Sequence, residues 1–209
     1  LDIQRIVVCS ENNLRAFKHI VDAAKEVYRG VKEKEVRQRS RHKHLDNWNI
    51  PSVVYCPDTH ERVEAAKYAL QPCYLLASRP NTERQFEADL EQSGRVNWWF
   101  KNGTKSEDYL GILYNDTETG RQAVFYPDYI VGYSDDSIGI LDTKDGFTLS
   151  QSETKDKAEA LYAYMQMARE HGKKIVGGIA YEKHSQWFVN DGSQYTPDSS
   201  SAGWLLMDR

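Results

Sequence analysis

Two apolar runs of this sequence carry charged residues where solvation alone does not explain them. One strand-prone run contains Asp128, and the next ends in Asp142, Thr143 and Lys144. Residues two apart in a strand lie on one face, about 6.6–6.8 Å apart, so Asp142 and Lys144 are expected to project together. A polar turn at residues 134–137 would pair the two strands and bring Asp128 towards the same point.

Two carboxylates that converge on one point repel each other unless a cation lies between them. Oxygen-only ligation favours Mg²⁺ or Mn²⁺ over Zn²⁺. Such a cation polarises a phosphoryl oxygen and lowers the pKa of bound water, while the Lys144 ammonium orients that water or stabilises developing charge. The residues therefore suit phosphodiester hydrolysis. The structural alternative is a cross-strand salt bridge at a sheet edge.

Other matches to the same residue pattern have the wrong context. Pro57-Asp58 and Pro197-Asp198 lack a nearby acid-x-Lys, and Glu153-Thr154-Lys155 follows a polar loop rather than an apolar strand. Neither a zinc motif of the HExxH type nor the phosphate-binding GxxxxGK[ST] motif occurs. Any ATP-driven motor would therefore lie outside this sequence.

Pro127-Asp128 and Asp142-x-Lys144 together resemble the motif of the PD-(D/E)XK nucleases. Three further stretches narrow the resemblance to the C-terminal endonuclease domain of type III restriction enzymes (the Res subunit) and related DEAD/DEAH helicase-nuclease fusions. These stretches are residues 82–86, 97–102 and 157–161. The resemblance covers roughly residues 80–180.

The resemblance implies a restriction-endonuclease-like α/β core, with a central mixed sheet flanked by helices. It implies an Mg²⁺- or Mn²⁺-dependent DNA endonuclease in which Asp128, Asp142 and the Thr143 carbonyl hold the metal. The helix before the sheet would add Glu83, with Glu87 one turn later as the alternative. It also implies partners: DNA, a helicase or translocase domain of the same parent chain, and a modification (methyltransferase) subunit. ATP would act only through that motor.

The elements that must position these residues follow from apolar periodicity. Helices are predicted over residues 82–93 and 155–171, because apolar residues recur there at spacings of three and four. Lys101 and Lys157, at the end of a strand and the start of the second helix, are assigned to DNA contacts. Strands are predicted over residues 96–101, 109–114, 123–133, 138–143, 174–181 and 186–189. This order indicates an α/β layer fold for residues 80–209.

Residues 1–79 are predicted to form a helical linking segment. A strand over residues 3–9 precedes a helix whose apolar stripe begins at Leu14, and an Arg- and Lys-rich run over residues 32–44 is a candidate phosphate contact. A strand over residues 52–55, a helix over residues 61–69 and an apolar run over residues 73–77 are expected before the domain boundary at residue 80.

Bulk composition fits a globular protein and limits the function classes. Of 209 residues, 40% are hydrophobic, and the three cysteines, Cys9, Cys56 and Cys73, are expected to be reduced. No secretory signal or membrane span is expected, so the predicted location is cytoplasmic, and the sequence is expected to be part of a longer chain.

Charge is uneven: residues 1–50 hold 11 Lys and Arg against 7 Asp and Glu, whereas residues 51–209 hold 16 against 24. An acidic module is expected to bind DNA weakly, since affinity depends on phosphate neutralisation. Most of the DNA binding is therefore assigned to the expected motor domain outside this sequence. Two alternatives stay open: a catalytically silent DNA-binding or motor-docking module of the same fold, and a stand-alone nuclease such as a resolvase.

Overall fold

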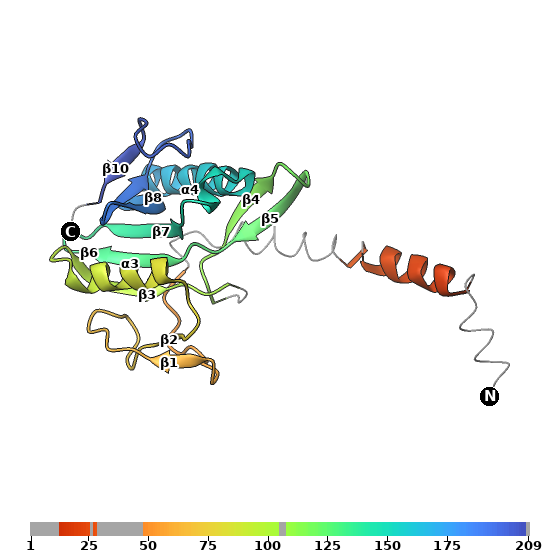
Figure 1. The fold of residues 1–209 in the computed structure, drawn as a ribbon, viewed down its shortest axis with the longest axis horizontal. Helices are drawn as coiled ribbons and strands as arrows, with labels where there is room; N and C mark the ends of the chain where they lie inside the picture. The colour runs from red at the N-terminus through yellow and green to blue at the C-terminus, as the bar shows by residue number, and fades with distance from the viewer. Residues whose placement is uncertain (1–12, 26, 29–47, 105–107, 208–209) are drawn as a thin grey trace. The chain divides into compact units, whose positions relative to one another are not determined.

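A computed structural model describes residues 13–25, 27–28, 48–104 and 108–207 of the chain (Figure 1). Contacts divide the chain into two compact units, Leu1–Arg41 and His42–Arg209. The predicted boundary at residue 80 falls inside the second unit, because residues before it pack against the sheet. The Ala69 amide donates to the Trp99 carbonyl at 2.8 Å, and Tyr68 forms an isolated bridge with the same residue.

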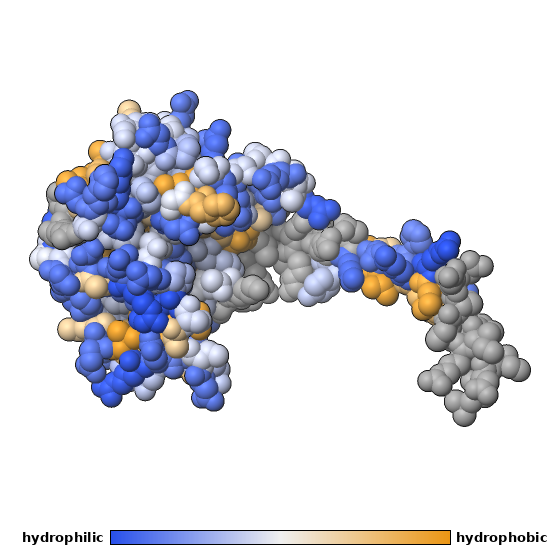
Figure 2. Space-filling model, viewed as in Figure 1, coloured by the Kyte–Doolittle hydropathy of each residue, from blue (hydrophilic) through white to orange (hydrophobic). Residues whose placement is uncertain are grey.

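In the first unit, residues 13–25 and 27–28 are helical, as predicted. Leu14, Phe17 and Val21 of the predicted stripe are 52%, 49% and 49% exposed, and apolar side chains are visible along this helix in Figure 2. The predicted strand over residues 3–9 and the basic run over residues 32–44 lie outside the described residues. Within the described part of the chain, no helix combines the length and apolar character that crossing a membrane requires.

The second unit is built on a six-stranded mixed sheet in the order β10-β9-β8-β7-β6-β3 (Figure 1). Only β7 and β8 pair in parallel, and the other neighbours are antiparallel. The predicted α/β class with a central mixed sheet is therefore confirmed. The strands are β3 (Val96–Lys101), β6 (Tyr129–Tyr133), β7 (Ile138–Lys144), β8 (Ile175–Lys183), β9 (Gln186–Asn190) and β10 (Trp204–Leu206).

Helix α3 (Asn81–Gln92) covers one face of this sheet. Its apolar stripe includes Phe86 and Leu90, which are completely buried. The Phe86 ring lies 5.0 Å from the Tyr129 ring of β6 and 4.6 Å from the Trp187 ring of β9. Tyr129 therefore points towards α3. Trp99 of β3 is also fully buried, with its ring 6.1 Å from the Tyr129 ring.

Helix α4 (Ser152–Glu170) covers the opposite face and follows the short 3-10 turn η2 (Thr148–Ser150). Ala158 of α4 and Ile179 of β8 belong to one buried cluster, so Ile179 points towards α4. Asp142 pairs with Ile179 and shares its face, whereas Leu141 pairs with Tyr129 and shares the α3 face. The alternation along β7 thus directs Asp142 and Lys144 towards α4.

Two small hairpins complete the unit: β1 (His60–Arg62) with β2 (Tyr74–Leu76), and β4 (Ile112–Asp116) with β5 (Arg121–Phe125). The predicted helix over residues 61–69 is wrong, because β1 and turns occupy it. The strand predicted over residues 52–55 does not form. The strand predicted over residues 123–133 is two strands, β5 and β6, separated at Pro127-Asp128. Proline cannot donate to a ladder, so the chain leaves one sheet there and enters another.

Gly177 of β8 is fixed by the parallel pairing that brings β7 into place. Its φ is +132°, and an added Cβ would lie 2.0 Å from the Ile140 carbonyl oxygen. We expect Gly177→Ala to lower the free energy of unfolding by more than about 3 kcal/mol, since both the backbone conformation and the strand spacing oppose it. Chemical denaturation measures this. Gly94→Ala is the matched control, because a Cβ there meets nothing within 4 Å; equal stability of the two variants would contradict the assigned packing.

Candidate functional site

Three strands of the sheet bring chemistry-bearing residues to one edge. Lys101 ends β3, Asp128 immediately precedes β6, and Asp142 and Lys144 lie at the end of β7. Because β6 is antiparallel to both neighbours, its beginning lies beside their ends. The predicted approach of Asp128 to the other residues is confirmed in this respect: Thr143 hydrogen-bonds Asp128 directly.

Asp142 and Lys144 form a nearly buried ion pair. Lys144 Nζ lies 2.5 Å from Asp142 Oδ2, with 18% and 6% of the two side chains exposed. The prediction that they share a strand face is confirmed. Asp142 Oδ2 is fully buried, and the Lys144 ammonium lies against it. Burial of two charges costs desolvation free energy, which their mutual attraction offsets in part.

The two residues have opposing pKa shifts. Burial, followed by the nearby Asp128 carboxylate, raises the pKa of Asp142 to about 6 despite the Lys144 ammonium. Burial alone would lower the pKa of Lys144, but the Asp142 and Asp128 carboxylates raise it above its ordinary value. The site thus contains a lysine held as a cation beside an aspartate that resists ionisation.

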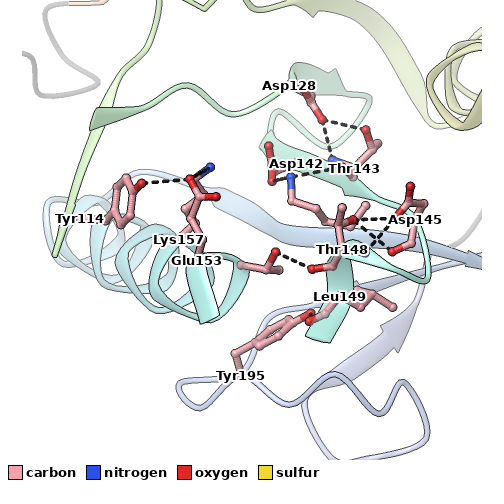
Figure 3. Close-up of polar contacts among 12 residues, drawn as sticks. Tyr114, Asp128, Asp142, Thr143, Asp145, Thr148, Leu149, Glu153, Lys157 and Tyr195 are labelled. Atoms are coloured by element: carbon pink, nitrogen blue, oxygen red, sulfur yellow. Dashed lines mark hydrogen bonds and ion pairs between the residues drawn. The ribbon is translucent and has the colours of Figure 1, made fainter. Parts of the chain in front are cut away.

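Asp128 is held in one orientation by contacts to both of its oxygens. Thr143 donates to Oδ2 from its amide at 2.8 Å and from its hydroxyl at 2.7 Å (Figure 3). Lys101 Nζ lies 3.3 Å from Oδ1. Burial alone would raise the pKa of Asp128, but Lys101, Lys144 and the Thr143 hydrogen bonds together lower it. Asp128 therefore ionises at a lower pH than Asp142.

Asn102 fixes the break between β5 and β6 and was missed in the sequence. Its Nδ2 donates to the carbonyls of Pro127 and Leu110, both at 2.9 Å, and its Oδ1 accepts from the Leu110 amide at 3.1 Å. Its own amide donates to the Asp128 carbonyl at 2.8 Å. The available signal was an uncharged polar residue directly after an apolar strand. Asn102 thus holds the backbone that presents Asp128.

Glu83, predicted to join the metal site, reaches Asp128 only through a lysine. Its Oε2 lies 2.9 Å from Lys101 Nζ. Across residues 13–25, 27–28, 48–104 and 108–207, no group of three or more His, Cys, Asp and Glu side chains is placed to hold a metal. The alternative residue Glu87 is occupied elsewhere, because it pairs with Arg79 at 2.8 Å and accepts from the Tyr129 hydroxyl at 3.1 Å.

Lys101 and Lys157, both assigned to DNA contacts, have different surroundings. Lys101 is enclosed by Glu83 and Asp128. Lys157, in the second turn of α4, lies 2.7 Å from Glu153, which also accepts from the Tyr114 hydroxyl at 3.1 Å (Figure 3). Although burial raises the pKa of Asp142, the Lys157 charge offsets part of that rise. Lys157 therefore adds positive potential on the α4 side of the site.

Oxygen atoms that could bind a metal ion gather at this end of the strands, beside the Lys144 ammonium. They are the carboxylate oxygens of Asp128 and Asp142 and the carbonyl oxygen of Thr143. The Thr143 oxygen lies 3.4 Å from Lys144 Nζ. These are hard ligands of the kind that Mg²⁺ and Mn²⁺ prefer. Oδ2 of Asp142 lies against Lys144 Nζ, so a bound cation would share this carboxylate with the lysine.

Comparison with known proteins gives one family. No curated protein and no solved structure was found to match the chain. The model of the YagJ family matches residues 74–187, which include β3, β6, β7, both covering helices and every predicted site residue. The description of this family names no activity. Since the match spans more than half of the 209 residues, the chain belongs to the YagJ family.

Proposed function

We propose that this protein is a metal-dependent endonuclease module of the PD-(D/E)XK type that hydrolyses DNA phosphodiester bonds. The observation that carries the proposal is the grouping at the end of β7: a buried Asp142 carboxylate, whose pKa is raised to about 6 by burial and by the nearby Asp128 carboxylate, lies 2.5 Å from the Lys144 ammonium. Shifted pKa values produced by burial and by a neighbouring like charge are typical of functional sites. The mixed sheet between two helices supports a restriction-endonuclease-like core.

The residues at this edge fit a divalent cation. Asp128, Asp142 and the Thr143 carbonyl would hold Mg²⁺ or Mn²⁺, which when bound would polarise a phosphoryl oxygen and make bound water more acidic. Thr143 and Lys101 keep Asp128 ionised and oriented. Lys144 stays protonated because its pKa is raised, so its ammonium can orient the attacking water and stabilise charge that develops on the phosphate.

The net negative charge of residues 51–209 supports a cleavage module that acts on DNA bound mainly by another domain or subunit. Residues 51–209 carry 16 Lys and Arg against 24 Asp and Glu, a balance that disfavours tight DNA binding. Lys157 is the cation that we assign to a phosphate near the site. Partners of the module would be a helicase or translocase domain and a modification subunit.

A catalytically silent module of the same fold is the second candidate. It is favoured by two observations: the described residues include no group of three metal-ligating side chains, and Lys101 already forms ion pairs with Glu83 and Asp128. Such a module would bind DNA or its motor without cutting.

Plasmid cleavage in Mg²⁺ or Mn²⁺ distinguishes these functions. We expect the wild type to nick or linearise the plasmid, and Asp142→Asn and Lys144→Met to reduce the rate at least about 1,000-fold. Asp58→Asn and Lys155→Met alter the rival motif positions, both exposed, and should leave the rate unchanged. Equal rates for all five proteins would exclude the proposed site. If none of the five proteins cleaves the plasmid, either alone or together with the proposed helicase domain and ATP, the silent module is favoured.

A further inference from the structure

Lys101 occupies the place between Glu83 and Asp128. Its Nζ lies 2.9 Å from Glu83 Oε2, 3.3 Å from Asp128 Oδ1 and 4.2 Å from the centre of the Tyr129 ring. Only 20% of the Lys101 side chain is exposed. Two carboxylates and an aromatic face thus surround one ammonium, which lies between the two negative charges.

The strands place Glu83 and Asp142 on different sides of the sheet. Lys101 pairs with Tyr129, so it shares the α3 face, and Glu83 lies in the first turn of α3. Asp142 shares the α4 face with Ile179. Asp128 precedes β6 and is held by two residues: Oδ1 faces Lys101 and Oδ2 accepts from Thr143, and its carboxylate is near enough to raise the pKa of Asp142.

We infer that the Lys101 ammonium takes the place of a metal ion on the α3 side of the site. Glu83 is then a positioning residue that acts through Lys101 rather than a metal ligand. Glu83 fixes the position of the Lys101 ammonium, and the ammonium in turn contacts Oδ1 of Asp128. These contacts would fix the orientation of the Asp128 carboxylate relative to Asp142. The absence of a three-acid metal group among the described residues follows from this arrangement. The inference rests on the proposed function only in its statement about metal ligation.

A double-mutant cycle in metal-free buffer tests the role of Lys101. Lys101→Met leaves Glu83 and Asp128 facing each other without a cation, so we expect the melting temperature to fall by about 3–6 °C. Glu83→Gln should lower the melting temperature slightly in the wild-type background. In the Lys101→Met background it should raise the melting temperature, because it removes one of two repelling carboxylates. Glu83→Gln lowering the value in both backgrounds, or changing it in neither, would overturn the inference.

The exposed pair Lys155 and Glu159, 3.9 Å apart on α4, provides the matched control. The corresponding cycle of Lys155→Met and Glu159→Gln should show shifts below about 1 °C and no change of sign, because exposed pairs at this spacing contribute little. A sign change in the control cycle would mean that the effect at Lys101 is not specific to the site.

Titration with Mn²⁺, followed by calorimetry, tests whether Glu83 is a ligand. Glu83→Gln should keep the Mn²⁺ dissociation constant within about threefold, whereas Asp142→Asn should weaken it more than about tenfold. Equal losses in the two variants would show that Glu83 is a ligand and overturn the inference. If the wild type binds no Mn²⁺, the cation part of the proposed function fails, and the metal-free cycle alone decides the role of Lys101.

Discussion

Asp142→Asn is expected to abolish DNA cleavage and at the same time to stabilise the metal-free protein. A structural salt bridge would behave in the opposite way, because its removal costs stability. The reason for the expected gain is that the folded protein disfavours the ionised form of Asp142, whose pKa rises from 3.8 to about 6. A neutral amide of the same shape avoids that cost, so the unfolding free energy should increase by up to about 3 kcal/mol at pH 8.

The pH dependence of this difference has a definite sign. Well below the unfolded pKa of 3.8, Asp142 is protonated in the folded and unfolded states, so wild type and variant should have nearly equal stability. Between the unfolded pKa of 3.8 and the folded pKa of about 6, the unfolded chain releases the proton first and the wild type loses stability relative to Asp142→Asn. Above about pH 7 the difference should be constant.

Chemical denaturation in EDTA at pH 4, 6 and 8 measures the effect, with Asp58→Asn as the exposed control. A variant less stable than the wild type at pH 8 would contradict the destabilising burial of the ionised Asp142 carboxylate. Restored activity at high Mg²⁺ would also contradict the assignment of Asp142 to the reacting centre.

Lys144→Met is expected to abolish cleavage and to destabilise the protein, the reverse of the stability effect of Asp142→Asn. The methionine retains the apolar part of the side chain but leaves Asp142 and Asp128 without the ammonium that lies 2.5 Å from Asp142 Oδ2. Removing one partner of a buried ion pair costs about 3–5 kcal/mol. Protonation of Asp142 limits this cost, so we expect a loss of about 2–3 kcal/mol at pH 8 and less at pH 5.

The double variant Asp142→Asn/Lys144→Met separates charge from packing. With residue 142 neutral, Lys144→Met should cost less stability than it does in the wild type, so the double variant in EDTA should be more stable than the sum of the two single effects predicts. Thermal unfolding of the four proteins at pH 5 and pH 8 measures this coupling. An equal cost of Lys144→Met in both backgrounds would mean that Lys144 stabilises the fold through contacts unrelated to Asp142.

Much of the core could be predicted from the sequence because its signals are local. The strand Val96–Lys101 was predicted at its observed bounds, and α3 and α4 differ from their predictions by only a few residues at each end. Between residues 61 and 69, the local helical pattern was misleading. There Glu61 is used by tertiary ion pairs with Arg79 and Arg84 at 2.9 and 3.1 Å, and the chain pairs as β1 instead. Tertiary pairing of this kind overrides weak propensity.

The candidate site was predictable only where strand geometry alone decides it. The common face of Asp142 and Lys144 follows from the two-residue period of a strand. The ion pairs of Lys101 with Glu83 and Asp128 join residues from three separate segments of the chain. The hydrogen bond from Asn102 to the Pro127 carbonyl depends on the path of the chain between β5 and β6, which belong to different sheets. Neither contact has a local signal in the sequence. The hydroxyl of Thr143 was also overlooked, since only its carbonyl had been assigned a role.

Anomalous diffraction from crystals soaked in Mn²⁺ tests most directly whether this sheet edge is a hydrolytic site. We predict a peak between the carboxylates of Asp128 and Asp142, within about 2.5 Å of an oxygen from each and absent from Asp142→Asn crystals. A peak bound by Glu83 in place of Asp142 would relocate the site to the α3 face. No peak at this edge at millimolar Mn²⁺, with the Asp142 and Lys144 pair unchanged, would contradict the proposed metal-dependent function.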